Sequence, residues 1–171
     1  MSVPVLTTDR LVLSGPAPAD LEEASAMWAH PDVYRGIGGR AFTREEVWHR
    51  LLRYIGHWQV LGYGSWTVRE RAGGAYVGDI GLMDSRRDTD PAFEGTPEAG
   101  WALAPAAQGR GYAAEALAAM LGWADARGLR QTVCMIAPAN TRSVRLAARL
   151  GYQPWTRGCY RGGVTDLYRR G

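Results

Sequence analysis

The chain contains no lysine, so all 20 of its basic residues are arginine. It has only two cysteines, and none of its apolar runs approaches the roughly eighteen residues that a membrane-spanning helix needs. Cys134 and Cys159 have neither a metal-ligand spacing nor the pattern of a disulfide framework. The N-terminal residues MSVPVLTTDR lack the apolar region of a signal peptide. These absences argue against a membrane protein, a disulfide-rich secreted protein and a cysteine-bound metal, and they favour a cytoplasmic protein.

The composition is that of an ordinary globular protein. Its 171 residues are 46% hydrophobic and 22% charged, which suits one domain over residues 1–171 with a sizeable core. The net charge of +3 is too small to indicate a nucleic-acid partner, and the arginines are spread along the chain. Cys134 lies in the apolar run TVCMIA, where we expect a buried filler and not a reactive thiol.

Hydrophobic patterns predict an alternation of strands and helices. Alternating or continuous apolar runs predict strands at residues 10–15, 62–70, 75–83, 98–103 and 131–136, and a closing hairpin at 159–170. Helices are expected at 18–32, where Pro31 is read as a stop, from about 43 to 58, at 111–127 and at 140–150. The polar residues 84–97 are expected to form a loop. The result is a mixed α/β (α+β) domain whose first half is mostly antiparallel.

Two of these helices carry clear end signals. Thr43 and Glu46 have the spacing of a capping box, and Val47, Leu51, Ile55 and Trp58 follow at helical spacing. Asn140 is a candidate N-cap of the last helix, and Gly151 follows its C-terminus. We expect the four apolar residues to form the buried face of the second helix.

The stretch QGRGYA, residues 108–113, places two glycines directly before a helix. Glycine permits positive φ and close approach of another group, and a helix N-terminus presents unpaired N–H groups and partial positive charge. Together they predict an anion site suited to phosphate, although a bare Gly-x-Gly is also typical of a tight turn that binds nothing. A P-loop is excluded because the chain has no lysine. The dinucleotide fingerprint fits badly because its third spaced glycine is missing.

The same stretch matches the Gln/Arg-x-x-Gly-x-Gly/Ala signature of the GNAT superfamily of N-acetyltransferases, and the resemblance covers nearly the whole chain. TDRLVL, GSWTV, YVGDIGL, EAGWAL, GYAAEAL and NTRSVRLAARLGY stand in that family's order. The combination most resembles the branch that contains the ribosomal-protein N-terminal acetyltransferases. It implies a mixed, mostly antiparallel central sheet of about six or seven strands with about four helices, and transfer of acetyl from acetyl-CoA to a primary amine without a metal.

The resemblance also assigns the coenzyme site. Backbone N–H groups of the signature loop would bind the pyrophosphate, and here these belong to Gln108, Gly109, Arg110, Gly111, Tyr112 and Ala113. Trp101, Ala102 and Leu103 would pair with the pantetheine arm like an added strand, with an N–H near Ala102 facing the acetyl carbonyl. An ordinary sheet strand explains the apolar side chains of residues 98–103 equally well.

Glu98 is the leading candidate for the general base, because it begins the strand that would carry the acetyl group and Gly100 leaves space on the same face. A carboxylate at a strand end is also commonly just solvated, so both interpretations stay open. Asp79 and His30 are weaker candidates. His57 lies on a helix rich in aromatic residues, where a structural role is expected.

The last predicted helix carries the remaining candidates. Many family members have a tyrosine there that protonates the leaving thiolate, and this chain has Ala147 at that position. Ser143 resembles the hydroxyl that some members of this branch place near the sulfur, but it also suits a first-turn serine that satisfies the backbone. Asn140 would contact the pantetheine arm, or act as an N-cap alone. Arg142, Arg145 and Arg149 share one side of the helix, where a solvated face is expected over contact with the 3′-phosphate of coenzyme A.

The acceptor is left open. A protein N-terminal α-amine and a small-molecule amine fit equally, and acidic residues in the 84–97 loop could attract a cationic amine, although Arg86 and Arg87 oppose this. Trp28 and Tyr34 flank a short loop where exposed aromatics would contact the acceptor. Ala147 motivates one alternative, a non-catalytic acyl-CoA-binding module. Monomer and homodimer both remain open.

Overall fold

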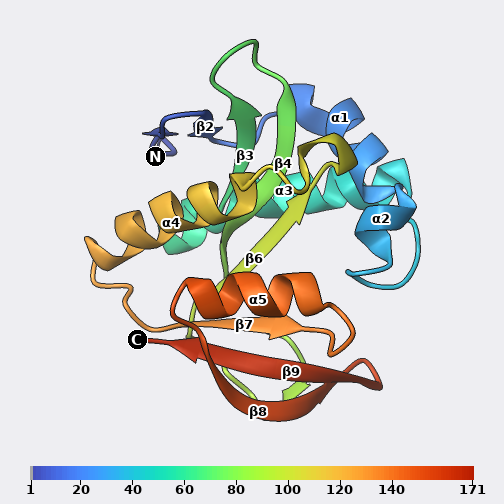
Figure 1. The fold of residues 1–171 in the computed structure, drawn as a ribbon, viewed down its shortest axis with the longest axis vertical. Coiled ribbons are helices and arrows are strands. Elements are labelled where there is room, and N and C mark those ends of the chain that lie inside the picture. The colour runs from blue at the N-terminus through green and yellow to red at the C-terminus, as the bar shows by residue number, and fades with distance from the viewer. Residues whose placement is uncertain (1) are drawn as a thin grey trace.

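The computed structural model describes residues 2–171, which form a nine-stranded sheet with helices on both faces (Figure 1). The strands are β1 (Leu6–Thr7), β2 (Leu11–Ser14), β3 (Ser65–Glu70), β4 (Tyr76–Met83), β5 (Thr89–Asp90), β6 (Glu98–Leu103), β7 (Thr132–Ile136), β8 (Gln153–Tyr160) and β9 (Gly163–Arg170). The helices are α1 (Leu21–Trp28), α2 (Pro31–Tyr34), α3 (Arg44–Leu61), α4 (Tyr112–Asp125) and α5 (Thr141–Arg149), with 3₁₀ turns at η1 (Pro18–Asp20) and η2 (Pro105–Ala107).

The sheet order is β1-β2-β3-β4-β6-β7-β9-β8-β5, and every pairing is antiparallel except that of β6 with β7. The mixed, mostly antiparallel architecture is confirmed. The expected six or seven strands were too few, because β1 and β5 were missed. Each of these strands is two residues long, too short to show an alternating pattern. The expected 84–97 loop therefore contains β5, which pairs with β8.

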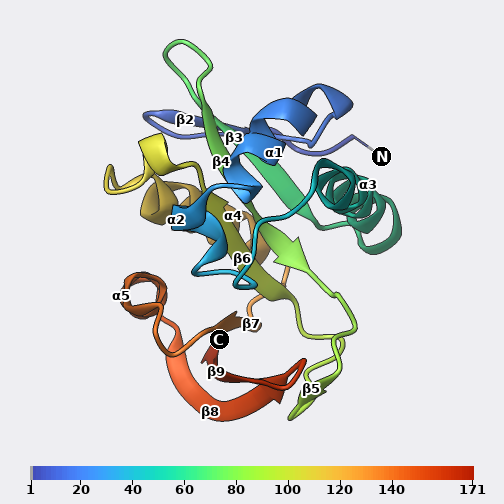
Figure 2. The same ribbon diagram turned by 90° about the vertical axis from the view of Figure 1, so that its right-hand side faces the viewer.

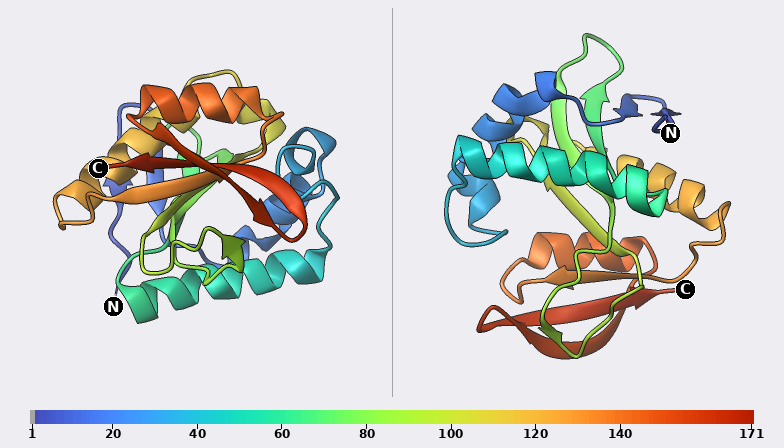
Figure 3. Two further views of the ribbon diagram at one scale, coloured as in Figure 1. Left: turned by 90° about the horizontal axis from the view of Figure 1, so that it is seen from below. Right: turned by 180° about the vertical axis from the view of Figure 1, so that it is seen from behind.

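Helices cover the sheet from both sides. Figure 2 and the right panel of Figure 3 show α3 and α4 on opposite faces of the β3–β4–β6 region, and α5 lies beside β7 on the α4 side. Trp58 of α3, Trp66 of β3 and Trp123 of α4 meet edge to face, with ring centroids 4.6–5.5 Å apart. Aromatic packing of this kind fixes the two helices against the strands between them.

Local signals set most helix ends. The capping box of Thr43 and Glu46 is confirmed, and α3 runs to Leu61, where Gly62 takes a left-handed conformation with φ 73°. The buried face of α3 uses Tyr54, whereas Ile55 is only partly buried. Pro31 does not simply stop a helix: α1 ends at Trp28, and Pro31 is the first residue of α2, where its missing N–H costs nothing.

Within residues 2–171, we find no helix with both the length and the hydropathy needed to cross a bilayer.

Candidate active site

Strands β6 and β7 diverge, and this divergence opens a cleft in the middle of the sheet. Glu98 and Val133 form the single register pair between them, whereas β6 pairs with β4 along its full length. Figure 1 shows β6 running steeply while β7 crosses below it nearly horizontally. Beyond Glu98, the β7-facing edge of β6 has no neighbouring strand in the part of the chain that the structure describes.

The register decides which groups of β6 face this opening. Ala104 N–H donates to Val77 O at 2.9 Å, so the alternation of antiparallel hydrogen bonds turns the backbone groups of Ala102 toward β4. The groups of Trp101 and Leu103 consequently point to the opening. The expected N–H near Ala102 that faces the acetyl group is therefore not that of Ala102 itself, and the backbone groups of its neighbours Trp101 and Leu103 are the ones that point to the opening.

The cleft has a volume of about 520 Å³ and collects residues from distant parts of the chain. Its walls come from β6 and β7, from the N-terminus of α5, from α3 and the loop before it, and from the β8–β9 turn. Of the predicted site residues, Glu98, Trp101, Ala102, Asn140 and Ser143 line it. Two segments far apart in the sequence, β6 and the start of α5, thus bring these five candidates together.

The signature loop lies at the N-terminus of α4 and has the conformation expected of an anion site. Gly109 and Gly111 have φ of +74° and +80°, and Gly111 is the N-cap. Across the described chain, the backbone N–H groups of residues 109–113 have no hydrogen-bond acceptor. Gln108 differs, because its N–H already donates to Pro105 O and its Nε2 to Leu103 O. An added Cβ on Gly109 would meet no atom within 4 Å, so space for a ligand exists there.

A network of side chains that we did not predict holds this loop in place. Arg10 pairs with Glu115 in the first turn of α4 at 2.6 Å and donates to the Arg110 carbonyl at 2.9 Å. Arg110 pairs with Glu70, which also accepts from the Tyr112 hydroxyl at 3.0 Å. The charge of Arg110 is therefore offset by a carboxylate, and the uncompensated donors of the loop are its N–H groups. No sequence pattern indicated these pairs, because their members lie 40 or more residues apart.

Glu98 is buried, with 5% of its surface exposed, and its Oε2 accepts from Arg87 Nε at 2.6 Å. Arg87 also donates to the Tyr160 hydroxyl at 3.0 Å. Burial lowers the pKa of Arg87, but the charge and hydrogen bond of Glu98 outweigh it and raise that pKa. The space beside Gly100 is filled by the end of the Met83 side chain, since an added Cβ would lie 2.6 Å from Met83 Cε. Glu98 is thus not simply solvated.

Ser143 accepts a hydrogen bond from Trp101 Nε1 at 3.2 Å, so α5 is joined directly to β6 across the cleft. Asn140 is confirmed as the N-cap, because its Oδ1 accepts from Ser143 N–H at 3.2 Å, and its Nδ2 lies 3.5 Å from Gly36 O. Ala147, one turn after Ser143, is fully buried in the core. Arg142, Arg145 and Arg149 are exposed, as a solvated face requires.

Of the two weaker base candidates, Asp79 lies in the cleft and His30 does not. Asp79 lines the cleft, but its two oxygens accept from Trp28 Nε1 at 3.0 Å and from the Tyr76 hydroxyl at 2.7 Å. Burial raises the pKa of Asp79 despite these two hydrogen bonds. His30 is the N-cap of α2 and does not line the cleft. His57 is half-buried on α3, and burial lowers its pKa.

The acceptor side differs from the expectation. Trp28 is buried, with 3% of its surface exposed, because it packs under Arg50 and against Phe42. The 84–97 loop contributes Arg87 to the cleft and none of its four carboxylates. Two of them, Asp84 and Glu94, pair with Arg86. Of the two opposing charges considered for this loop, it is therefore an arginine and not a carboxylate that lines the cleft.

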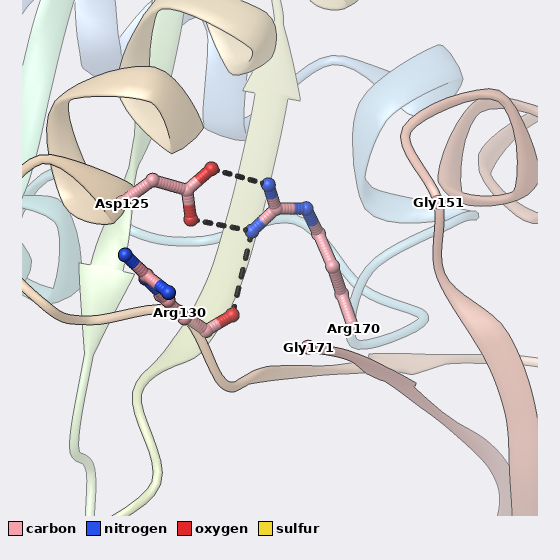
Figure 4. A pocket seen from close by; sticks show the side chains of 5 residues that line it. All are labelled: Asp125, Arg130, Gly151, Arg170 and Gly171. Carbon is pink, nitrogen blue, oxygen red and sulfur yellow. Dashed lines mark hydrogen bonds and ion pairs between the residues drawn. The ribbon is translucent and has the colours of Figure 1, made fainter.

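A second hollow lies at the far end of α4 (Figure 4). Arg170 bridges Asp125, at 2.6 Å, and the Arg130 carbonyl, at 3.4 Å. These contacts pair the charges of Arg170 and Asp125 and hold β9 to α4. The hollow is remote from the predicted site residues, so we assign it a structural role. In residues 2–171 no group of three His, Cys, Asp or Glu side chains has a geometry that could hold a metal ion.

Comparison with known proteins agrees with this geometry. The family model described as "Acetyltransferase (GNAT) domain" matches residues 10–153. A protein described as a GNAT-family acetyltransferase from Bordetella pertussis is 35% identical, with coverage of 99% of this chain and 100% of that chain and a TM-score of 0.87. An acetyltransferase from Agrobacterium tumefaciens C58 is 28% identical over 100% and 96% of the two chains, with a TM-score of 0.84. RimL, described as a ribosomal L7/L12 α-N-protein acetyltransferase in complex with coenzyme A, shares the fold with a TM-score of 0.77. It is 16% identical, with coverage of 98% of this chain and 97% of that chain.

Proposed function

The chain belongs to the GNAT acetyltransferase family and is an N-acetyltransferase, and from this premise we propose that it moves acetyl from acetyl-CoA to a primary amine by direct attack in a ternary complex. Enzymes of this family use acetyl-CoA and act on amine acceptors such as proteins or small molecules. The observation that carries the proposal is the opening between β6 and β7, which is bordered by the strand that leads, through η2, to the signature loop at the N-terminus of α4.

The residues present fit the coenzyme. Unpaired N–H groups at residues 109–113 would bind the pyrophosphate, with the partial positive charge of the α4 N-terminus behind them. The outward-facing backbone groups of Trp101 and Leu103 would pair with the amides of the pantetheine arm. When bound, acetyl-CoA supplies the thioester whose acetyl group is transferred. The Trp101 N–H would then stabilise negative charge on the acetyl oxygen.

Two side chains would manage the protons. Glu98 is the proposed base, directly or through a water molecule, because it is a buried carboxylate at the end of the strand that borders the opening. Ser143 is the proposed donor to the departing thiolate, and the hydrogen bond from Trp101 orients its oxygen. Because a thiol of this kind titrates near 8.5, it leaves readily and the donor contributes modestly.

A direct test incubates the protein with acetyl-CoA and a panel of amines and peptides, and measures free thiol together with acetylated product by mass spectrometry. We expect acceptor-dependent thiol release in 1:1 ratio with acetylated amine. Tight coenzyme binding without turnover of any acceptor would contradict the proposal.

A further inference from the structure

The cleft that would receive the acceptor carries more positive than negative charge. Five arginines line it, against three carboxylates. The arginines are Arg40, Arg50, Arg53, Arg87 and Arg161, and the carboxylates are Glu46, Asp79 and Glu98. Two of the arginines are compensated, because Arg40 pairs with Glu46 and Arg87 with Glu98. Arg50, Arg53 and Arg161 have no ion-pair partner in residues 2–171.

Arg50 is held rigidly with hydrogen-bonding capacity to spare. Its guanidinium lies over the rings of Trp28, at 4.0 Å, and Phe42, at 4.8 Å. Nη1 donates to the Tyr54 hydroxyl at 3.3 Å. Nη2 has no acceptor among the described residues and is not buried, whereas Nε also lacks an acceptor but is buried. Asp79 is close enough to attract Arg50, yet both Asp79 oxygens accept from Trp28 and Tyr76. An unpaired donor on a fixed, stacked guanidinium is the arrangement that binds an oxyanion.

Arg53 lies three residues after Arg50, nearly one turn along α3, and it also lines the cleft and adds to this charge. It keeps contact with solvent, but desolvation by the surrounding protein lowers its pKa, and the positive charges of Arg50 and Arg87 lower it further. Like charges gathered around one opening favour a bound anion, which would relieve their repulsion.

These arginines are badly placed for the coenzyme pyrophosphate. Arg87 pairs with Glu98, at the opposite end of β6 from the signature loop, and Arg53 is close enough to Arg87 to feel its charge. At a rise of about 3.3 Å per residue, the strand alone separates its two ends by about 17 Å. The cleft lining also contains none of residues 108–113. The charge therefore belongs to the acceptor side.

Building on the proposed function, we infer that the acceptor is an amine that also carries an anionic group, a carboxylate or a phosphate, and that Arg50 and Arg53 bind this group. The shared chemistry is an oxyanion next to a primary amine. A simple cationic amine is disfavoured, because its positive charge would enter a cleft that already has an excess of arginine.

Matched acceptors separate the two sources of the anion. A panel of amino acids is compared with the corresponding amino-acid amides, and O-phosphoethanolamine with ethanolamine, by kcat/KM from thiol release. The α-amine of an amide is neutral more often near pH 7 than that of the free amino acid, so intrinsic reactivity favours the amide. We expect the anionic member of at least one pair to be preferred about tenfold or more, the gain typical of one charge-assisted hydrogen bond.

Variants assign that preference to the arginines. Arg53→Gln and Arg50→Gln should raise KM for the preferred anionic acceptor about tenfold more than KM for its neutral counterpart. Arg71→Gln, at the exposed β3–β4 turn, removes the same charge away from the cleft and should change neither. Thermal melting identifies any loss caused by unfolding, and Arg53→Gln keeps the test valid if Arg50→Gln fails to fold.

A second readout does not depend on turnover. Calorimetry measures binding of each matched pair to the protein saturated with coenzyme A, where wild type should bind the anionic member and Arg53→Gln should bind it more weakly. Equal use of neutral and anionic amines, or unchanged kinetics in both variants, would overturn the inference while leaving the acetyltransferase proposal standing. Absence of turnover with every amine would instead count against the proposed function, and the calorimetric comparison would still decide the charge preference.

Discussion

Replacing Gly109 by alanine separates the role of this glycine in the chain from its role toward a ligand. Gly109 has φ +74°, where an L-residue costs about 1 kcal/mol, and its added methyl would meet no protein atom within 4 Å. For a chain of this size, that strain lowers the melting temperature by about 2–4 °C. The protein itself therefore tolerates the change.

A bound pyrophosphate would not tolerate it equally well. The N–H groups of residues 109–113 lack acceptors, and a methyl in the space above Gly109 would keep a phosphate from some of them. Loss of one or two charge-assisted hydrogen bonds, at about 1.5 kcal/mol each, weakens coenzyme affinity by about 10-fold to 100-fold. Isothermal titration of wild type and Gly109→Ala with coenzyme A measures this directly.

Gly128, beyond the other end of α4, provides a matched control. It has φ +80°, is exposed, and its added Cβ also meets nothing within 4 Å. Gly128→Ala should lower the melting temperature as much as Gly109→Ala and leave coenzyme affinity unchanged. If the two variants bound coenzyme A equally, the assignment of the pyrophosphate to this loop would be refuted.

Four further changes test the site and its surroundings. Glu98→Gln should lower kcat about 100-fold with unchanged coenzyme A affinity, and an unchanged kcat would exclude Glu98 as the base. Ser143→Ala should lower kcat about tenfold with unchanged coenzyme affinity, and a full loss of affinity would show that Ser143 binds and does not donate. Asp79→Asn should change activity by no more than about twofold and should be at least as stable as wild type, because an amide can still hydrogen-bond Trp28 and Tyr76 without a buried charge. A large loss of kcat would restore Asp79 as a base candidate. Burial lowers the pKa of His57 below 6.5, so the folded state favours the neutral ring, and this contribution to stability falls as the pH drops through 6.5. The melting temperature of His57→Gln should therefore fall less over that pH range than the melting temperature of wild type. Parallel curves of melting temperature against pH would contradict this.

Much of the fold could be predicted because its signals are local. The capping box at Thr43 and the glycine after α4 each act within one helical turn, and the alternating strands show their buried face in any short window. Strands β1 and β5 could not be found this way, because a two-residue strand exists only through its partner. Tyr54 replaced Ile55 in the core for a similar reason, since the neighbours of α3 decide which side of it is covered.

The candidate site likewise has one part that a local signal in the sequence indicates and another that depends on the tertiary structure. Arg50 was missed, although one signal was available: it lies three residues after Val47 and four before Tyr54, on the side of α3 that becomes buried. The pairing of Glu98 with Arg87, by contrast, depends on how the 84–97 loop folds back over the end of β6. No pattern in the sequence specifies that path.

By itself, the sequence determined the secondary structure around the signature, the glycine conformations at the start of α4 and the family. These depend on interactions between near neighbours, whose energies are present in any window of a dozen residues. Only the tertiary structure decided that β6 parts from β7 after one pair, that the backbone groups of Trp101 and not those of Ala102 face the opening, and that arginines from four separate segments surround it. Strand register and the meeting of distant charges arise when the whole core packs, because that packing fixes which backbone edge and which side chain is left without a partner.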